Sequence, residues 1–223
     1  MKKKIIDIET FKSFLKDDMR IMVGGFAGCG VPDVLIQGIL ESGVKNLTII
    51  SNDSTHPGEG ISLLIANNQI KKLIASHIGM NPQTGEKYNS GELEVQLVPQ
   101  GTLAESIRAA GAGLGGVLTK TGLGTEVAEG KETIVIDGET YLVEKPIHAD
   151  MAVIRGSVVD EFGNTTYKGT TRNFNPVMAT AADLVVAAAE KVVKIGELEK
   201  ENIVTPGIFV DYIVGGEPVE FKR

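Results

Sequence analysis

Short apolar runs alternate with amphipathic stretches along most of the chain. Runs typical of buried strands fall at residues 20–23, 46–50, 72–78, 94–98, 151–155 and 183–189. Between them the sequence predicts helices at residues 32–41, 61–68, 102–109 and 176–182, each opened by a turn or capping signal. This alternation is typical of an α/β fold with an open, mainly parallel sheet and flanking helices. Ligands of such sheets bind beyond the carboxyl ends of the strands.

Residues 133–144 follow a different pattern. Two alternating runs flank Asp137-Gly138, a dipeptide that favours the tight turn of a β-hairpin. We therefore expect a small β-hairpin insertion beside the main sheet. No internal repeat, low-complexity tract or Pro- and Ser-rich linker divides the 223 residues, so we predict a single domain over residues 1–223.

Composition narrows the classes of function. The chain has 29 acidic and 22 basic residues and a net charge of −7, which argues against nucleic-acid binding. No apolar run approaches the roughly 18 residues of a membrane span, and Asp7 and Glu9 interrupt the apolar region that a signal peptide would need. A single cysteine excludes an intramolecular disulfide and a multi-cysteine metal site, and the histidines lack the spacing of a joint site. We expect a cytoplasmic protein without a metal.

A glycine-rich loop joins the first of these strands to the next helix. The residues that we expect to bind a ligand there are Gly24, Gly25, Phe26, Ala27, Gly28, Cys29 and Gly30. Glycine lets a ligand approach the backbone closely, and N–H groups before a helix favour a phosphate or a carbonyl that becomes negative. The loop lacks the Gly-Lys-Ser/Thr of a Walker A site, and its glycine order reverses G-x-G-x-x-G. The alternative to a binding loop is a tight strand-to-helix turn without a ligand. We expect the Cys29 thiol to fill space in the loop and not to act as a nucleophile.

A second candidate site lies where the predicted strand 94–98 ends. Thr102 and Glu105 have the spacing of a capping box, which would place Gln100 just before a helix N-terminus. The side-chain amide of Gln100 can donate a hydrogen bond to an oxyanion, although a solvated glutamine beside an ordinary cap has the same sequence. The residues that we predict to line the substrate pocket at these strand ends are Asn52, Ser54, Gly101 and Thr102.

Four segments carry a family resemblance that covers nearly the whole chain. They are Val23-Gly24-Gly25-Phe26 through Gly28, Gly30 and Pro32; Val98-Pro99-Gln100-Gly101-Thr102-Leu103-Ala104-Glu105; Thr121-Gly122-Leu123-Gly124-Thr125; and Arg172-Asn173-Phe174-Asn175-Pro176. In this order and spacing they closely resemble the A (alpha) subunit of class I coenzyme A-transferases. From the residues alone, the last segment is either a structural turn or a loop that contacts a partner.

The resemblance implies a coenzyme A-transferase-like fold and a ping-pong transfer of coenzyme A from an acyl-CoA to a carboxylate such as acetate, butyrate or acetoacetate. A 3-oxoacid transferase that uses succinyl-CoA is an alternative within the family. Members use a glutamate of the B (beta) subunit, in a Glu-Asn-Gly sequence, which forms an acyl anhydride and then a glutamyl-CoA thioester. Glu201-Asn202 of this chain is followed by Ile203. The chain thus lacks the nucleophile and should be inactive without a B subunit.

The resemblance also implies roles for individual residues. Residues 24–30 carry the coenzyme A-binding assignment, and Gln100 lies where a donor to the reacting carbonyl is expected. Coenzyme A and acyl-CoA are expected as substrates, with no tightly bound cofactor, in a hetero-oligomer with the B subunit.

Two functions outside this family are also compatible with the residues. One is a sugar-phosphate isomerase-like enzyme, which would act alone and need its own acid–base pair. The other is a non-catalytic module that binds acyl-CoA or another anion without turnover. Co-purification of a B-type chain that contains Glu-Asn-Gly would separate the transferase from both.

Overall fold

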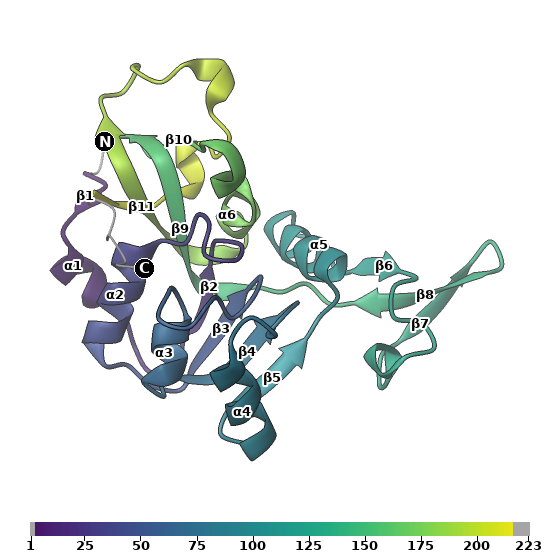
Figure 1. Cartoon of the computed structure of the whole chain (residues 1–223). Helices are drawn as coiled ribbons and strands as arrows, with labels where there is room; N and C mark the ends of the chain where they lie inside the picture. Colours follow the sequence, from purple (N-terminus) through teal and green to yellow (C-terminus); the bar gives the residue numbers. More distant parts are fainter. Residues whose placement is uncertain (1–2, 216–223) are drawn as a thin grey trace.

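The computed structural model describes residues 3–215, and a nine-stranded sheet forms its centre (Figure 1). The strands are β1 (Ile5–Ile6), β2 (Arg20–Val23), β3 (Leu47–Ser51), β4 (Ile70–Ala75), β5 (Glu94–Leu97), β9 (Ala149–Asp160), β10 (Thr165–Thr166), β11 (Ala182–Val193) and β12 (Tyr212–Gly215). Their order is β1-β12-β11-β9-β2-β3-β4-β5, with every neighbouring pair parallel, while β10 pairs antiparallel with β9. The predicted open, mainly parallel sheet is confirmed.

Helices cover both faces of this sheet, which is why the central strands β2 and β3 are mostly apolar and buried. The helices are α1 (Ile8–Lys12), α2 (Asp33–Ser42), α3 (Ser62–Ala66), α4 (Pro82–Ser90), α5 (Gln100–Gly111) and α6 (Asn175–Met178). In β2, Ile21 and Val23 pack into one core with residues of α1, α2 and α3. Met22 points to the other face, into a core with residues of α5 and α6. Alternation along each strand therefore supplies two cores from one sheet.

The start of α5 differs from the sequence prediction. The helix begins at Gln100 and not at Thr102, because the Pro99 carbonyl already accepts a helical hydrogen bond from the Leu103 N–H at 2.8 Å. The predicted capping box is therefore wrong. Thr102 is the third residue of the helix, and its buried hydroxyl has no hydrogen-bond partner among the described residues.

Three other predicted boundaries are shifted. The strand predicted over residues 72–78 ends at Ala75, and the chain then bends at Ser76. The helix predicted over residues 176–182 is the short α6, and Ala182 already starts β11. Pro32 precedes α2 as its N-cap, one residue before the expected position.

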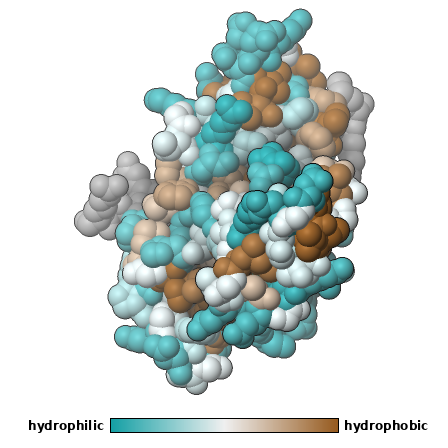
Figure 2. All heavy atoms as spheres, turned by 90° about the vertical axis from the view of Figure 1, so that its right-hand side faces the viewer, coloured by the Kyte–Doolittle hydropathy of each residue, from teal (hydrophilic) through white to brown (hydrophobic). Residues whose placement is uncertain are grey.

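A small antiparallel sheet extends from the main body beyond α5 (Figure 1). It consists of β6 (Val117–Thr119), β7 (Thr133–Ile136) and β8 (Glu139–Glu144) in the order β6-β8-β7. The expected hairpin is confirmed: Asp137 and Gly138 both have positive φ, as a primed turn requires. Seen from the side of this sheet, apolar side chains lie among hydrophilic ones on the surface (Figure 2).

Short 3-10 helices complete the described chain. They are η1 (Glu126–Ala128), η2 (Gly169–Arg172), η3 (Lys200–Asn202) and η4 (Gly207–Phe209). Within residues 3–215, no helix has the length and apolar character to cross a membrane.

Candidate active site

The glycine-rich loop leaves β2 at its carboxyl end, where the Gly24 N–H donates to the Val153 carbonyl of β9 at 3.0 Å. Positive φ angles follow at Gly25 (124°), Ala27 (48°), Gly28 (82°) and Gly30 (72°). A Cβ on Gly25 would lie 2.5 Å from Val31 Cγ2. Both the backbone conformation and the space therefore require glycine at position 25.

Hydrogen bonds within the loop decide which amides remain available. Phe26 and Cys29 pair with each other, since the N–H of each donates to the carbonyl of the other at 3.0 and 2.8 Å. The Ala27 N–H donates to Asp53 Oδ2 at 2.7 Å. Within the described part of the chain, the N–H groups of Gly25, Gly28 and Gly30 have no hydrogen-bond partner. A ligand oxygen that accepts a hydrogen bond from the loop backbone therefore has these three N–H groups available.

Asp53 anchors this loop to the end of β3, and it was not among the predicted site residues. Its carboxylate is buried and also accepts hydrogen bonds from Asn52 Nδ2 at 2.7 Å and from the Thr55 N–H at 2.8 Å. The available signal was an aspartate directly after a buried strand, where a charge needs partners. The loop that was predicted to bind a ligand is thus fixed from the neighbouring strand end.

Ser76 links two of the predicted site residues. Its hydroxyl contacts Gln100 Oε1, and it lies 2.8 Å from the Asn52 carbonyl oxygen and 3.4 Å from Asn52 Oδ1. Asn52, Ser76 and Gln100 follow or end the adjacent strands β3, β4 and β5, so the structure brings them together at one edge of the sheet. Ser76 itself was not among the predicted site residues.

The remaining predicted pocket residues have different surroundings. Ser54 is fully buried, and its hydroxyl donates to the Ile78 carbonyl at 3.3 Å. Gly101 is exposed in the first turn of α5, and a Cβ there would meet open space. Thr102 is buried beneath that turn. Contact of these residues and of Asn52 with substrate stays a prediction.

Arg155, which lies next to the loop, is paired with two carboxylates. Arg155 Nη1 donates to the Val31 carbonyl at 3.2 Å and to Asp33 Oδ2 at 3.3 Å, and its Nε donates to Glu190 Oε1 at 2.8 Å. Burial raises the pKa of Asp33 to about 6, while Arg155 opposes this shift and Glu59 adds to it. Because Asp33 and Glu190 both pair with Arg155, they neutralise most of its positive charge, and little of that charge remains to attract a phosphate. The loop offers amides more than a free cation.

Cys29 lies within the loop but contacts no group that would activate it as a nucleophile in the described chain. Its Sγ is 2.9 Å from Thr170 Oγ1, and the residue is half-buried. A basic neighbour is what ordinarily lowers a thiol pKa. The space-filling role stays the preferred interpretation.

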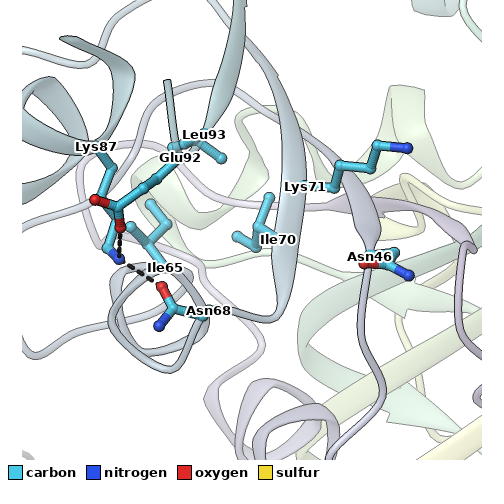
Figure 3. Close-up of a pocket in the computed structure, with 8 residues that line it drawn as sticks. All are labelled: Asn46, Ile65, Asn68, Ile70, Lys71, Lys87, Glu92 and Leu93. Atoms are coloured by element: carbon cyan, nitrogen blue, oxygen red, sulfur yellow. Dashed lines mark hydrogen bonds and ion pairs between the residues drawn. The ribbon is translucent and has the colours of Figure 1, made fainter. Parts of the chain in front are cut away.

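A cavity of about 280 Å³ lies on the opposite edge of the main sheet (Figure 3). It opens around the amino ends of β3 and β4, next to Asn46, Asn68 and Ile70. Inside it, Lys87 Nζ donates to Asn68 Oδ1 at 2.5 Å and to Glu92 Oε2 at 3.3 Å (Figure 3). In a parallel sheet the amino and carboxyl ends form opposite edges, so this cavity is separate from the glycine loop and Gln100.

Known proteins similar to this chain belong to the family that its sequence motifs resemble. The model of the family described as Coenzyme A transferase matches residues 6–216. The acetoacetyl-CoA:acetate/butyrate CoA transferase alpha subunit of Clostridium acetobutylicum is 59% identical over 214 residues, which cover 96% of this chain and 98% of the relative. The acetate CoA-transferase subunit alpha of Escherichia coli K12 is 51% identical over 214 residues, covering 96% and 97%.

A solved structure supports the fold. The acyl-CoA transferase YdiF of Escherichia coli O157:H7, in a thioester complex with CoA, superposes with a TM-score of 0.84 at 23% identity. The match covers 96% of this chain but 50% of YdiF, so the chain spans about half the length of that protein. At 23% identity this similarity shows a common fold only. Membership of the family rests on the family model and on the two relatives of higher identity. The chain belongs to the coenzyme A transferase family.

Proposed function

We propose that this chain is the A subunit of a two-subunit coenzyme A-transferase that moves coenzyme A between a short-chain acyl-CoA and a carboxylate such as acetate, butyrate or acetoacetate. The observation that carries the proposal is the 59% identity, along nearly the full length of both chains, to a relative named as an alpha subunit with acetate and butyrate specificity. The half of YdiF that this chain does not cover corresponds in the proposal to a separate B subunit.

The proposed reaction begins with a glutamate of the B subunit. Its carboxylate attacks the thioester carbonyl, the C–S bond breaks and coenzyme A leaves as a thiolate, giving an acyl-glutamyl anhydride. The thiolate then attacks the glutamyl carbonyl, which releases the acyl group as a carboxylate and leaves a glutamyl-CoA thioester. A second carboxylate reverses these steps and departs as the new acyl-CoA.

This chain's contribution is electrostatic and positional. Attack on the thioester places negative charge on the carbonyl oxygen, and a prearranged donor such as Gln100 Nε2 stabilises that charge. The free amides of the glycine loop can receive a phosphate or carbonyl oxygen of acyl-CoA. Since Arg155 is already engaged by Asp33 and Glu190, we assign much of the contact with the nucleotide phosphates to the B subunit.

The alternatives are weighed against the same relatives. A succinyl-CoA:3-oxoacid transferase differs in substrate and not in chemistry, so it stays the alternative within the proposal. The relatives' names support neither an isomerase-like enzyme nor a non-catalytic binding module. We further propose that the enzyme acts in the cytoplasm, where the free thiol of Cys29 stays reduced.

The test is turnover of acetyl-CoA with butyrate by this chain alone, and by the complex obtained on co-expression with its genomic neighbour. We expect the complex to be active and this chain by itself to be inactive. We also expect the neighbour's chain to contain a Glu-Asn-Gly sequence. A complex in which that glutamate is changed to glutamine is the matched control and should be inactive. Activity of this chain by itself would overturn the two-subunit proposal.

A further inference from the structure

The segment that runs from η2 into α6 lies directly against the glycine loop, although about 145 residues separate the two in sequence. Asn173 Nδ2 donates to the Cys29 carbonyl at 3.0 Å, and Asn175 Nδ2 donates to the Gly30 carbonyl at 3.0 Å. From the sequence alone, this segment is either a turn or a loop that contacts a partner. In the structure, its two asparagines hold two successive carbonyls of the loop.

The contact made by Asn173 fixes the direction of a free amide. A trans peptide is planar, so its C=O and N–H point in opposite directions. The Cys29 carbonyl accepts from Asn173 Nδ2 and from the Phe26 N–H, so the N–H of the same peptide, which belongs to Gly30, points away from both. This Gly30 N–H is one of the three loop amides without a partner among the described residues.

Asn175 fixes the base of the loop. It is fully buried, and its Oδ1 accepts from the Arg155 N–H at 2.9 Å while its Nδ2 also donates to the Thr171 carbonyl at 2.8 Å. A Cβ on Gly24 would lie 1.8 Å from Asn175 Oδ1, so this amide fills the space that glycine leaves. The loop, β9 and the segment after η2 therefore share one buried amide.

We propose that Asn173 and Asn175 are positioning residues for acyl-CoA: they turn the carbonyls of Cys29 and Gly30 inward, so that the Gly30 amide faces a phosphate oxygen of the bound coenzyme A. The inference rests on the proposed function and names residues that act through the loop. Neither asparagine needs to touch substrate. The acceptor carboxylate does not use this amide, because by then coenzyme A is already joined to the enzyme.

Asn173→Asp in the assembled enzyme tests this, because a carboxylate has nearly the same volume but cannot donate and repels the Cys29 carbonyl. We expect kcat/KM for acetyl-CoA to fall about tenfold or more, while kcat/KM for butyrate stays within about twofold. In the butyrate half-reaction, coenzyme A is already bound in the glutamyl-CoA intermediate and stays bound in the transition state. The contact with coenzyme A therefore contributes equally to both states and does not change kcat/KM for butyrate. Asn202→Ala, at an exposed asparagine of η3, is the control and should leave both values unchanged.

A purely structural role would give a different result. Loss of folded enzyme lowers both kcat/KM values by the same factor, and that outcome, or an unchanged value for acetyl-CoA, overturns the proposal. If Asn173→Asp does not assemble, the test uses Asn173→Ala, which removes the donor without adding charge. If the wild-type complex turns over no acyl-CoA, the proposed function fails. Calorimetric titration of the complex with coenzyme A then tests the role of the asparagines separately. A Kd for coenzyme A that is about tenfold higher in the variant supports this role, and an equal Kd refutes it.

Discussion

Gln100 stabilises an oxyanion only if its amide nitrogen, and not its amide oxygen, faces the substrate. Its Oε1 contacts the Ser76 hydroxyl, and this contact directs Nε2 away from Ser76. We therefore expect Gln100→Ala to lower kcat about 10² to 10³ fold in the assembled enzyme, since one oxyanion donor is lost. Steady-state kinetics measures this, with size-exclusion chromatography to show that assembly is intact.

Gln83→Ala is the matched control for that change. Gln83 also lies exposed in the first turn of a helix, α4, and should be silent in the assay. An unchanged kcat in Gln100→Ala would show that the glutamine is an ordinary solvated residue at the start of α5, which is the alternative that its sequence context left open.

Asp33 gives the fold a specific pH dependence. Burial raises its pKa from 3.8 to about 6, so the native state keeps this proton to a higher pH than the unfolded chain. The protonated carboxyl therefore stabilises the fold fully below about pH 4, and the contribution is lost as pH rises through 6. In Asp33→Asn this loss is absent, so the Tm of the variant should rise relative to wild type between these two pH values.

Thermal unfolding at several pH values across that window measures the effect. Asp137→Asn is the control, because Asp137 is exposed at the hairpin turn and asparagine suits its positive φ equally well. Parallel Tm curves for wild type and Asp33→Asn would contradict the assigned role of Asp33.

The strand-to-helix connection after β2 depends on backbone geometry more than on side chains. Gly25 combines a φ of 124° with a Cβ position 2.5 Å from Val31 Cγ2, so Gly25→Val must move the loop. We expect the assembled variant to lose all measurable turnover because the free amides of Gly28 and Gly30 no longer keep their positions. The assay is acetyl-CoA turnover by the assembled variant.

Gly43→Val separates strain from position. Gly43 ends the helix that this loop begins and has a φ of 71°, and a Cβ at this position would have nothing within 4 Å. Valine there therefore strains the backbone without displacing a neighbour. It should lower stability and leave kcat unchanged. Full activity of Gly25→Val would refute the need for close backbone approach at position 25.

Most elements with a strong apolar pattern were predictable, although β12, which buries Ile213 and Val214, was missed. The run at β2 matches the observed strand residue for residue, because all three of Ile21, Met22 and Val23 are buried. Helix α4 is mostly polar and its only buried residue is Thr84, so hydrophobic spacing carried no signal for it. The far halves of β9 and β11 were missed because small and polar residues interrupt the apolar runs there.

The candidate site was predictable where neighbouring residues in sequence make it, and not where distant ones do. Glycine spacing located the loop, and a strand end located Gln100. The anchoring by Asp53, and the contacts of Asn173 and Asn175, depend on which strands lie side by side in the sheet. Local sequence contains no information of that kind, so these supports emerged only with the three-dimensional arrangement.

The molecule as a whole presents the loop and Gln100 along one edge of a parallel sheet, without a nucleophilic glutamate of the Glu-Asn-Gly type in the sequence. The proposed chemistry therefore requires that the covalent intermediate form on the other subunit. When the complex receives acetyl-CoA without an acceptor, we expect the B chain to gain the mass of coenzyme A less one water. The mass of this chain should not change.

Mass spectrometry of the denatured, separated subunits distinguishes the possibilities. Hydroxylamine should remove the adduct, because it cleaves thioesters, and a B chain with glutamine in place of the nucleophile should acquire none. A coenzyme A adduct on this chain would place a nucleophilic carboxylate here, whereas the gain of an acetyl group alone would indicate thioester exchange with Cys29, the chain's single cysteine, which lies within the loop. The location of one covalent bond thus decides whether the loop serves a partner's nucleophile or supplies its own.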